Sequence, residues 1–498
     1  MPIPWPLEEI DLLIREGRNG EARKRLQLIE VKSVRRSDRR PLANLARRAQ
    51  MLNLAIRLLN PVVRSEEILA AQATDAERAE YGVSLIFLGA TQEGLEILNG
   101  VSDDGIPEAL LFRSFGLFSS WNYKEAIPLL EKYIPRAPST YQRLVGTLNL
   151  TAALIFCREL DRASEHLENL LRESEAGFKM LHGNSLELGA QIEIFRGRFR
   201  KAESLLAKAA TVLEDTGGIY EFFVRKWWAI LAVNRDGPTP AAVEGLGRIG
   251  KEAILKRHWE TVRDCDYHRG IALRDGGLLK HVYFGTPYER FRERIPLGML
   301  DRGCSRDEYP WQLGSGSSSR VFDLAMGSEE LGRHDMNSNP KLLTAFRALA
   351  NDFYSPARIA TLFSFLFPNE FFNPQSSPHR VHETLRRLRG WFKLNDVPLT
   401  VSHDAGQYRL AATGPYCLLT RPQNSITRRE FLINELHRTR SAQSFSSMTV
   451  AQILGVSPRF SQDLLRWAVE SGQMSRFGQG RGTRYRFNSA ALELPLVS

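Results

Sequence analysis

The fold is decided by Asn122-Tyr123-Lys124-Glu125-Ala126-Ile127, a stretch followed by Leu129, Leu130 and Pro138. It describes a short turn that leads into an amphipathic helix, with a small residue where two helices approach and a proline at the exit. The same pattern recurs, less completely, at three other small residues: Gly94, Ala163 and Ala202. With Ala126 these residues are 32, 37 and 39 positions apart. Self-similarity at this spacing predicts stacked pairs of helices.

This pattern resembles the tetratricopeptide repeat, a pair of helices with a period of roughly 34 residues. The resemblance covers about residues 10–275, although most of the repeat's aromatic and glycine positions are replaced. It implies a helical-repeat array at residues 1–275, because a single pair cannot bury its apolar stripe and must stack on its neighbours. The concave face of such an array usually binds a peptide or a protein. A role only in spacing or dimerising the molecule is the alternative.

Length and cysteine usage indicate an intracellular protein of several domains. At roughly 150 residues per domain, 498 residues suggest about three domains. The four cysteines are far apart and form no C-x-x-C pair, which argues against a disulfide framework and a thiolate metal site: Cys157, Cys265, Cys304 and Cys417. The N-terminus does not resemble a signal peptide, and no apolar stretch approaches roughly 18 residues. We therefore expect a cytoplasmic protein without a membrane segment, of a bacterial type.

The positive charge is concentrated in the last third of the chain. Residues 318–498 contain 22 Lys and Arg against 14 Asp and Glu, a net charge of +8. The first 317 residues contain 45 and 43, so they contribute only +2 to the total of +10. A basic region favours an acidic partner such as nucleic acid, with an ordinary basic surface as the alternative.

The helical pattern fades from Gly276 to Asn339, and we expect residues 276–317 to connect the array to the C-terminal third of the chain. Residues 314–319 read as an exposed, serine-rich link. Residues 320–327 predict a short strand that ends in a turn. The arginine-rich stretch from Tyr283 to Arg306 predicts a charged helix that packs on the last repeat.

Residues 318–414 predict a first winged-helix domain, with three helices and a hairpin. The first helix begins at Pro340, and Ser355-Pro356 caps the second. The third runs from about Pro378 to Leu394 and has one buried stripe: Val381, Leu385, Leu388 and Phe392. Two strands then flank Asp404-Ala405-Gly406.

The stretch Arg380-Val381-His382-Glu383-Thr384-Leu385-Arg386-Arg387-Leu388-Arg389, with the hairpin end Gly406-Gln407-Tyr408-Arg409-Leu410, resembles the DNA-binding domain of two-component response regulators. In that family the third helix enters the major groove and the hairpin contacts the minor groove. The resemblance implies base or phosphate contacts by Arg386 and Arg387, a phosphate contact by Arg389, and Thr384 at the groove floor. Arg380 and His403 are further candidates. Gly390-Trp391-Phe392 departs from the family's basic run, and no receiver domain precedes, so phosphorylation control is not implied.

Residues 425–490 predict a second winged-helix domain. Ile426 to Leu436 is its first helix, and Met448 to Ser457 a short helix, a turn and a cap. Pro458 to Glu470 resembles the recognition helix of bacterial helix-turn-helix proteins, with four exposed candidates for DNA contact: Arg459, Ser461, Gln462 and Arg466. The glycine-rich hairpin after this helix adds three cationic candidates: Arg476, Arg481 and Arg484. In both modules the alternative is a surface for protein contacts.

The sequence carries no recognised catalytic motif, so we expect no enzyme, no cofactor and no metal site. Helical spacing places Asp264 and His268 on one face near Glu260 and His258, which favours a polar helix face over a metal site. The pair Trp227-Trp228 is expected to be core between repeats.

Taken together, these patterns predict a mostly α protein, with an N-terminal α-solenoid followed by two small α+β winged-helix domains. The leading hypothesis is a transcriptional regulator that binds double-stranded DNA through both modules. Its array would sense a protein or peptide partner or form a homodimer. The alternative is a protein–protein interaction scaffold or adaptor that does not bind DNA.

Overall fold

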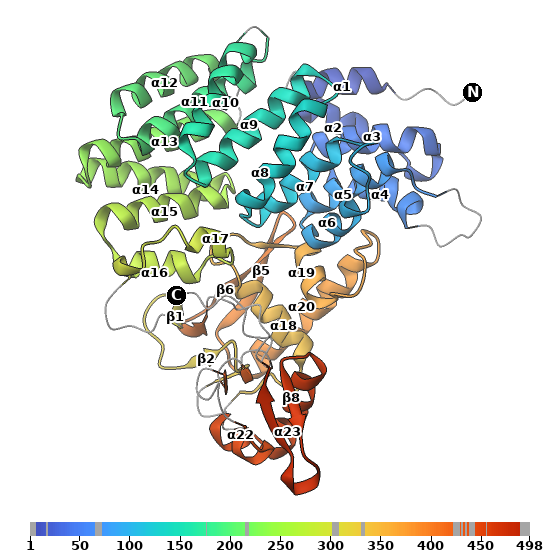
Figure 1. Cartoon of the computed structure of the whole chain (residues 1–498), viewed down its shortest axis with the longest axis vertical. Coiled ribbons are helices and arrows are strands. Elements are labelled where there is room, and N and C mark those ends of the chain that lie inside the picture. Colours follow the sequence, from blue (N-terminus) through green and yellow to red (C-terminus); the bar gives the residue numbers. More distant parts are fainter. Residues whose placement is uncertain are drawn as a thin grey trace.

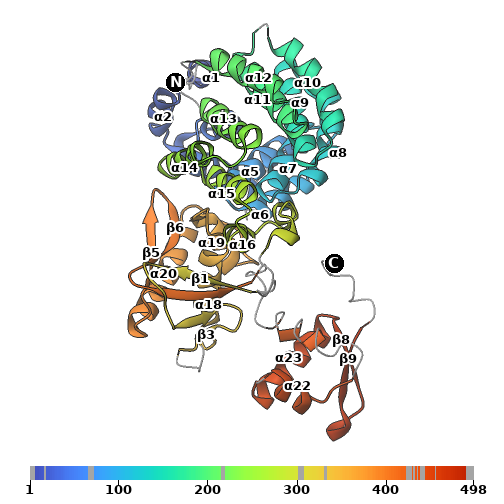
Figure 2. The same cartoon turned by 90° about the vertical axis from the view of Figure 1, so that its left-hand side faces the viewer.

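The protein is mostly α-helical, as predicted, with an N-terminal array of paired helices followed by two small α+β modules (Figures 1 and 2). The computed structural model describes residues 6–15, 18–64, 72–175, 177–214, 219–300, 308–329, 334–421, 429, 432–433, 436–437, 444–454 and 456–488, apart from the side chain of residue 481. Within those ranges no helix is both long and apolar enough to cross a bilayer.

The array consists of consecutive helices that pack in antiparallel pairs and curve into an arc (Figure 1). Its helices are α1 (Leu7–Arg15), α2 (Asn19–Gln27), α3 (Arg36–Arg48), α4 (Leu52–Val63), α5 (Asp75–Leu88), α6 (Thr91–Asn99), α7 (Glu108–Ser119), α8 (Tyr123–Tyr133), α9 (Thr140–Phe156), α10 (Leu160–Ser174), α11 (Lys179–Phe195), α12 (Phe199–Leu213), α13 (Ile219–Asp236), α14 (Pro240–Leu255), α15 (Trp259–Leu273) and α16 (Gly276–Phe284).

The small residues that mark the repeats lie where paired helices approach most closely. Gly94 in α6 is buried, and Ala126, Ala163 and Ala202 in α8, α10 and α12 are fully buried. A Cβ atom at Gly94 would lie 2.6 Å from the carbonyl oxygen of Gly82 on α5, too close for any larger side chain. The prediction of a helical-repeat array is therefore confirmed.

The array extends beyond the end predicted for it. The helical pattern does not fade at Gly276, because α16 begins there and buries Leu279 and Val282. Gly270 on α15 makes room for Leu279: an added Cβ would lie 2.8 Å from its Cδ2. The predicted charged helix is much shorter than expected: α17 spans only Glu289–Arg292, and residues 301–307 lie outside the described part of the chain.

The first module has the predicted three helices and hairpin. They are α18 (Pro340–Ala350), β4 (Ala357–Arg358), α19 (Ile359–Leu366), α20 (Ser377–Leu394), β5 (Leu399–Asp404) and β6 (Gln407–Ala412). The predicted stripe of α20 is buried. Ser355 does not cap α19, however, because Ala357 and Arg358 pair with β6 before the helix begins at Ile359.

A four-stranded sheet joins this module to the segments on either side of it. Its strands are β1 (Tyr309–Leu313), β7 (Tyr416–Thr420), β2 (Val321–Asp323) and β3 (Ser328–Glu329), in the order β1-β7-β2-β3. β2 confirms the short strand predicted at residues 320–327, and the turn after it includes Gly327 at φ +72°. β1 belongs to the stretch predicted as a connection, and β7 lies between the two predicted modules.

The second module consists of α22 (Ser447–Leu454), α23 (Pro458–Glu470) and a hairpin of β8 (Met474–Phe477) and β9 (Arg484–Phe487). The hydroxyl of Ser457 accepts a hydrogen bond from the backbone N–H of Phe460, which confirms the predicted cap of α23. The helix predicted at Ile426 to Leu436 lies largely outside the described residues. Figure 2 shows that this module stands apart from the array.

The first module contacts the array at two places that are far apart in the sequence, one at α5 and α6 and the other at α15. At α5 and α6, the Thr361 hydroxyl donates to the carbonyl oxygen of Gly89 (3.0 Å), and Glu93 accepts from the Phe372 N–H (2.9 Å). At α15, Arg263 pairs with Asp352 in the loop after α18 at 2.6 Å. Apolar residues of α1–α5 and of the module also belong to one continuous core. The module therefore bridges two separate parts of the array.

We expect Gly89→Ala to reveal this docking. Gly89 ends α5 at φ +106°, and a Cβ there would lie 2.5 Å from Oγ1 of Thr361. Backbone strain alone costs about 1–3 kcal/mol, and the clash additionally disrupts the packing of α19 on α5. Gly197→Ala is the control, since Gly197 also has a positive φ (+71°) but open space around it. Denaturant unfolding and hydrogen exchange should show faster exchange in α19 for Gly89→Ala only. Equal exchange in the two variants would contradict the docking.

Candidate functional sites

Several arginines predicted to contact DNA from the first module are bonded within it. Arg380 forms a two-pronged ion pair with Glu370, with one N–O distance of 2.8 Å, and also lies over the ring of Phe367. Arg386 pairs with Glu383 at 2.7 Å. Arg389 donates from Nε to the carbonyl oxygen of Val401 at 2.9 Å. The two glutamate pairs reduce the net positive charge that α20 can offer to phosphate, whereas Arg389 keeps its charge.

Other predicted residues of α20 and the hairpin differ in exposure. Thr384 is buried, and its hydroxyl donates to the carbonyl oxygen of Arg380, so it does not face a groove floor. Arg387 is exposed and has no ion-pair partner among the described residues. His403 is exposed and stacks on Tyr408, with ring centroids 4.6 Å apart.

The tip of the first module's hairpin lies on the array. Asp404 pairs with Arg257 in the turn between α14 and α15 at 2.6 Å, and Gln407 accepts from the indole N–H of Trp259 at 3.2 Å. In this conformation the array occupies the space in front of the tip. The minor-groove contact that the resemblance implies for the hairpin therefore requires the tip to leave α14 and α15.

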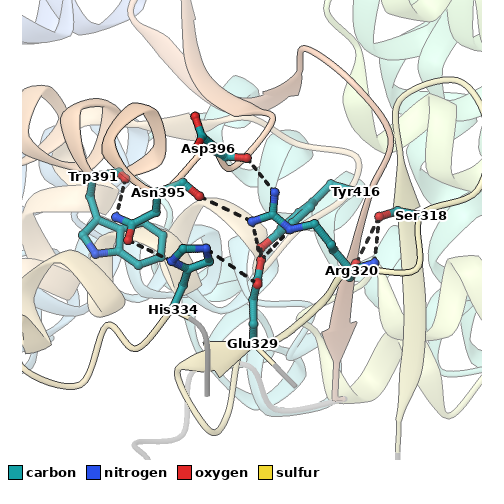
Figure 3. A network of polar contacts seen from close by, with 8 residues as sticks. All are labelled: Ser318, Arg320, Glu329, His334, Trp391, Asn395, Asp396 and Tyr416. Atoms are coloured by element: carbon teal, nitrogen blue, oxygen red, sulfur yellow. Dashed lines mark hydrogen bonds and ion pairs between the residues drawn. The ribbon is translucent and has the colours of Figure 1, made fainter. Parts of the chain in front are cut away.

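A buried polar network fixes the carboxyl end of α20 on the four-stranded sheet (Figure 3). Glu329 accepts hydrogen bonds from Arg320 (2.7 Å) and from the hydroxyl of Tyr416 (2.7 Å). Arg320 also donates to the carbonyl oxygen of Asp396, just beyond α20, at 2.7 Å. His334 bonds the side chain of Asn395 at 2.9 Å. The orientation of α20 therefore depends on the sheet as well as on α18 and α19.

Of the arginines predicted to contact DNA, the second module has three that are exposed without a carboxylate partner among the described residues, whereas the first module has one, Arg387. Arg459, Arg476 and Arg484 are exposed and form no ion pair within the described residues, whereas Arg466 lies 3.4 Å from Asp463. Gln462 is exposed as predicted. The predicted exposure of Ser461 is wrong, because it is fully buried and its hydroxyl donates to the carbonyl oxygen of Ser447. The side chain of Arg481 lies outside the described part.

A cavity of about 310 Å³ lies among the alternate helices α9, α11, α13 and α15 of the array. Its wall combines amides, aromatic rings and charges. The charged members are three cations and two acids: Arg158, Lys226, Arg294, Glu187 and Asp264. The amides and aromatic residues are Asn149, Asn184, Gln191, Tyr123, Phe156, Phe195, Phe223 and Trp227. A concave site with a few convergent polar groups is the usual form of a ligand site.

One acid of the cavity is paired and the other is not. Asp264 accepts from Lys226 Nζ at 2.9 Å. Burial disfavours the charged form of Asp264, yet Lys226, His268 and Arg294 hold the pKa of its carboxyl below the usual range. Among the described residues Glu187 has no ion-pair partner; it accepts a hydrogen bond from the Gln191 side chain (2.8 Å), and burial raises its pKa to about 7. Burial likewise lowers the pKa of His268 to about 4, so this residue is neutral at pH 7.

Buried donors around the cavity have no hydrogen-bond partner within the described residues. They are the indole N–H of Trp227 and Nη1 of Arg294, on two lining residues; Nε2 of His268, which does not line the cavity, is also unbonded. The first two groups can only donate. A buried donor that is left unpaired costs about 1–3 kcal/mol. The cavity therefore matches a ligand that brings acceptor atoms.

Sequence reasoning does not find this cavity. It predicts Trp227 as core, and Trp227 is buried, but this residue also forms part of the cavity wall. The sequence indicates the polar face of α15 at Asp264 and His268, whereas it does not indicate their partner Lys226 on α13. The available signal is the number of polar residues in α11 that the helix buries, including Glu187, Gln191 and Glu193.

These features define a helical-repeat protein with a polar cavity inside its array and two small α+β modules. No protein-family model matches the chain, and no curated protein matches it. Among solved structures, this chain is similar to one titled "Crystal Structure of Rap Protein Complexed with Competence and Sporulation Factor", with a TM-score of 0.41 and 15% sequence identity. That match covers 56% of this chain and 84% of that chain. A likeness at this level carries no conclusion about function.

We expect Glu187→Gln to change how stability depends on pH. Because the pKa of Glu187 is about 7 in the folded protein against an ordinary 4.5, its contribution is complete below pH 4.5 and is lost as pH rises through 7. Gln imitates the protonated acid, so the variant should gain stability over the wild type between about pH 5 and about pH 8, by at most about 3 kcal/mol. Denaturant unfolding measures this difference.

Glu168→Gln, at an exposed position of α10, is the matched control and should show no such trend. A difference between wild type and Glu187→Gln that stays constant over this pH range would mean that Glu187 is not held protonated by burial.

Proposed function

We propose that this chain is a protein-interaction regulator whose helical array binds a short polypeptide in the cavity between α9, α11, α13 and α15. The observation that carries the proposal is the cavity wall, which brings the amides of Asn184 and Gln191 together with the cations Arg158 and Arg294. A polypeptide offers one carbonyl acceptor per residue, and the amides of Asn184 and Gln191 can pair with both its donors and its acceptors. Helical-repeat arrays commonly use their concave surface in this way.

The proposal predicts that short peptides of random sequence contain members that stay bound to the full-length protein. After incubation and size-exclusion separation, mass spectrometry of the protein fraction identifies the retained peptides. Removing two amide hydrogen bonds at about 1 kcal/mol each should reduce retention by about tenfold or more in Asn184→Leu/Gln191→Leu. Gln27→Leu, exposed on α2, is the control and should retain peptides like the wild type. No retained peptide from any pool would contradict the proposal.

A second function, DNA binding, is favoured by the surface of the second module. Arg459 on α23 and Arg476 and Arg484 on the hairpin are exposed without carboxylate partners in the described residues. A recognition-type helix and a cationic hairpin together suit a groove and its flanking phosphates. The corresponding surface of the first module is weaker, because Arg380 and Arg386 are paired with glutamates. The second module is therefore the main candidate for the DNA contact.

This assignment predicts a module-specific salt dependence. Fluorescence anisotropy with a labelled duplex, between about 50 and about 200 mM salt, gives the slope of log affinity against log salt. Removing one arginine–phosphate interaction should flatten the slope by about 0.9, so Arg459→Ala/Arg476→Ala/Arg484→Ala should flatten it by up to about 2.7. The control Arg380→Ala/Arg386→Ala, in the first module, should leave it nearly unchanged. The second function fails if the wild type does not bind DNA at the lowest salt.

A further inference from the structure

The charges of the cavity do not balance. Lys226 is matched by Asp264 at 2.9 Å, while Arg294 reaches the same carboxylate only at 4.0 Å. Arg158 has no carboxylate partner among the described residues; its guanidinium lies 3.6 Å from the centroid of the Phe195 ring. The second acid, Glu187, is largely protonated below neutral pH because burial raises its pKa to about 7. Two guanidinium groups therefore share one wall without an anion of their own.

The two arginines lie close enough to repel each other. Desolvation by the surrounding protein and then the charge of Arg294 lower the pKa of Arg158. Arg158 is exposed at the edge of the cavity, and it holds a positive φ of 63° in the turn between α9 and α10. Arg294 lies deeper, with its side chain 15% exposed and Nη1 unbonded. An anion between these two lining residues would relieve the repulsion.

Aromatic rings close the wall around Arg294. Its guanidinium carbon lies 4.6–5.9 Å from four ring centroids, those of Tyr267, Phe291, Trp121 and Phe156. Trp121, Tyr267 and Phe291 are not part of the cavity lining, so the cavity ends at Arg294 on the side of these rings. A ligand group that binds beside Arg294 is therefore a terminal group of the ligand and not an internal one.

We infer that the cavity holds the carboxyl terminus of its polypeptide ligand, with the terminal carboxylate bound between Arg158 and Arg294. This inference rests on the proposed polypeptide function and names the part of the ligand that is recognised. A carboxylate is planar, carries one charge and accepts two parallel hydrogen bonds, which matches the fork of a guanidinium. The indole N–H of Trp227 is a further donor in the same wall.

The test compares two versions of one random-sequence peptide pool, made with free carboxyl ends or with carboxamide ends. Full-length protein is incubated with each pool, separated by size exclusion, and the retained peptide is measured by mass spectrometry. We expect the amide pool to be retained at least about tenfold less, since it lacks the charged acceptor. Arg158→Gln and Arg294→Gln should each reduce retention of the acid pool towards that of the amide pool. Arg57→Gln, exposed on α4, should not.

The outcomes separate this inference from the function it rests on. Equal retention of both pools would overturn the terminal carboxylate but leave polypeptide binding intact. Retention of neither pool would overturn both. Displacement of the acid pool by inorganic phosphate but not by acetate would assign the site to a phosphate-bearing ligand and overturn the inference. If Arg294→Gln does not fold, as judged by circular dichroism, Arg158→Gln decides alone, because its side chain lies at the edge of the cavity.

Discussion

The buried guanidinium of Arg263 is the contact on which the arrangement of the whole chain depends. Its side chain is fully buried, yet it donates to Glu260 on its own helix at 2.9 Å and to Asp352 of the first module at 2.6 Å. Removing one partner of a buried ion pair typically costs about 3–5 kcal/mol. Residue 263 thus ties α15, near the end of the array, to the loop that precedes α19. Together with the docking of α19 on Gly89 at the end of α5, this ion pair holds the module against two separate parts of the array.

The cavity and the first module both contact the same helix, α15. Asp264, the residue after Arg263, faces the cavity and pairs with Lys226, and Trp259 at the start of α15 holds the hairpin through Gln407. A ligand that competes for Lys226 acts on the same rigid element that positions the hairpin. Coupling between two sites requires such a shared element with more than one stable position. The docked hairpin, held by Arg257 and Trp259, is the position that the structure shows.

Sequence patterns predict the elements well and their mutual contacts poorly. The spacing of Gly94, Ala126 and Ala163 predicts the helical pairs, because small residues are needed wherever two helices touch. The buried apolar stripe of α20 is predicted equally well, because burial follows the helical period. The docking of the first module cannot be predicted from the sequence. Gly89, Thr361 and Asp352 have the ordinary features of cap, helix and loop residues, and only the tertiary fold brings them into contact with their partners. The wrong predictions at Thr384 and Ser461 have a related cause: small hydroxyl side chains are as easily buried against a backbone carbonyl as exposed.

The cavity cannot be predicted from the sequence for a different reason. Its groups come from several helices spread over more than a hundred residues, so no local spacing relates Arg158 to Arg294 or Lys226 to Asp264. The sequence does contain one unusual feature: in α11 the polar residues Glu187 and Gln191 occupy positions that the fold buries. Burying them without full hydrogen bonding lowers the stability of the array. An array that served only to space the modules would have gained from apolar residues there. The proposed polypeptide ligand would complete their hydrogen bonds, and under that proposal the local weakness of the fold and the site have the same origin.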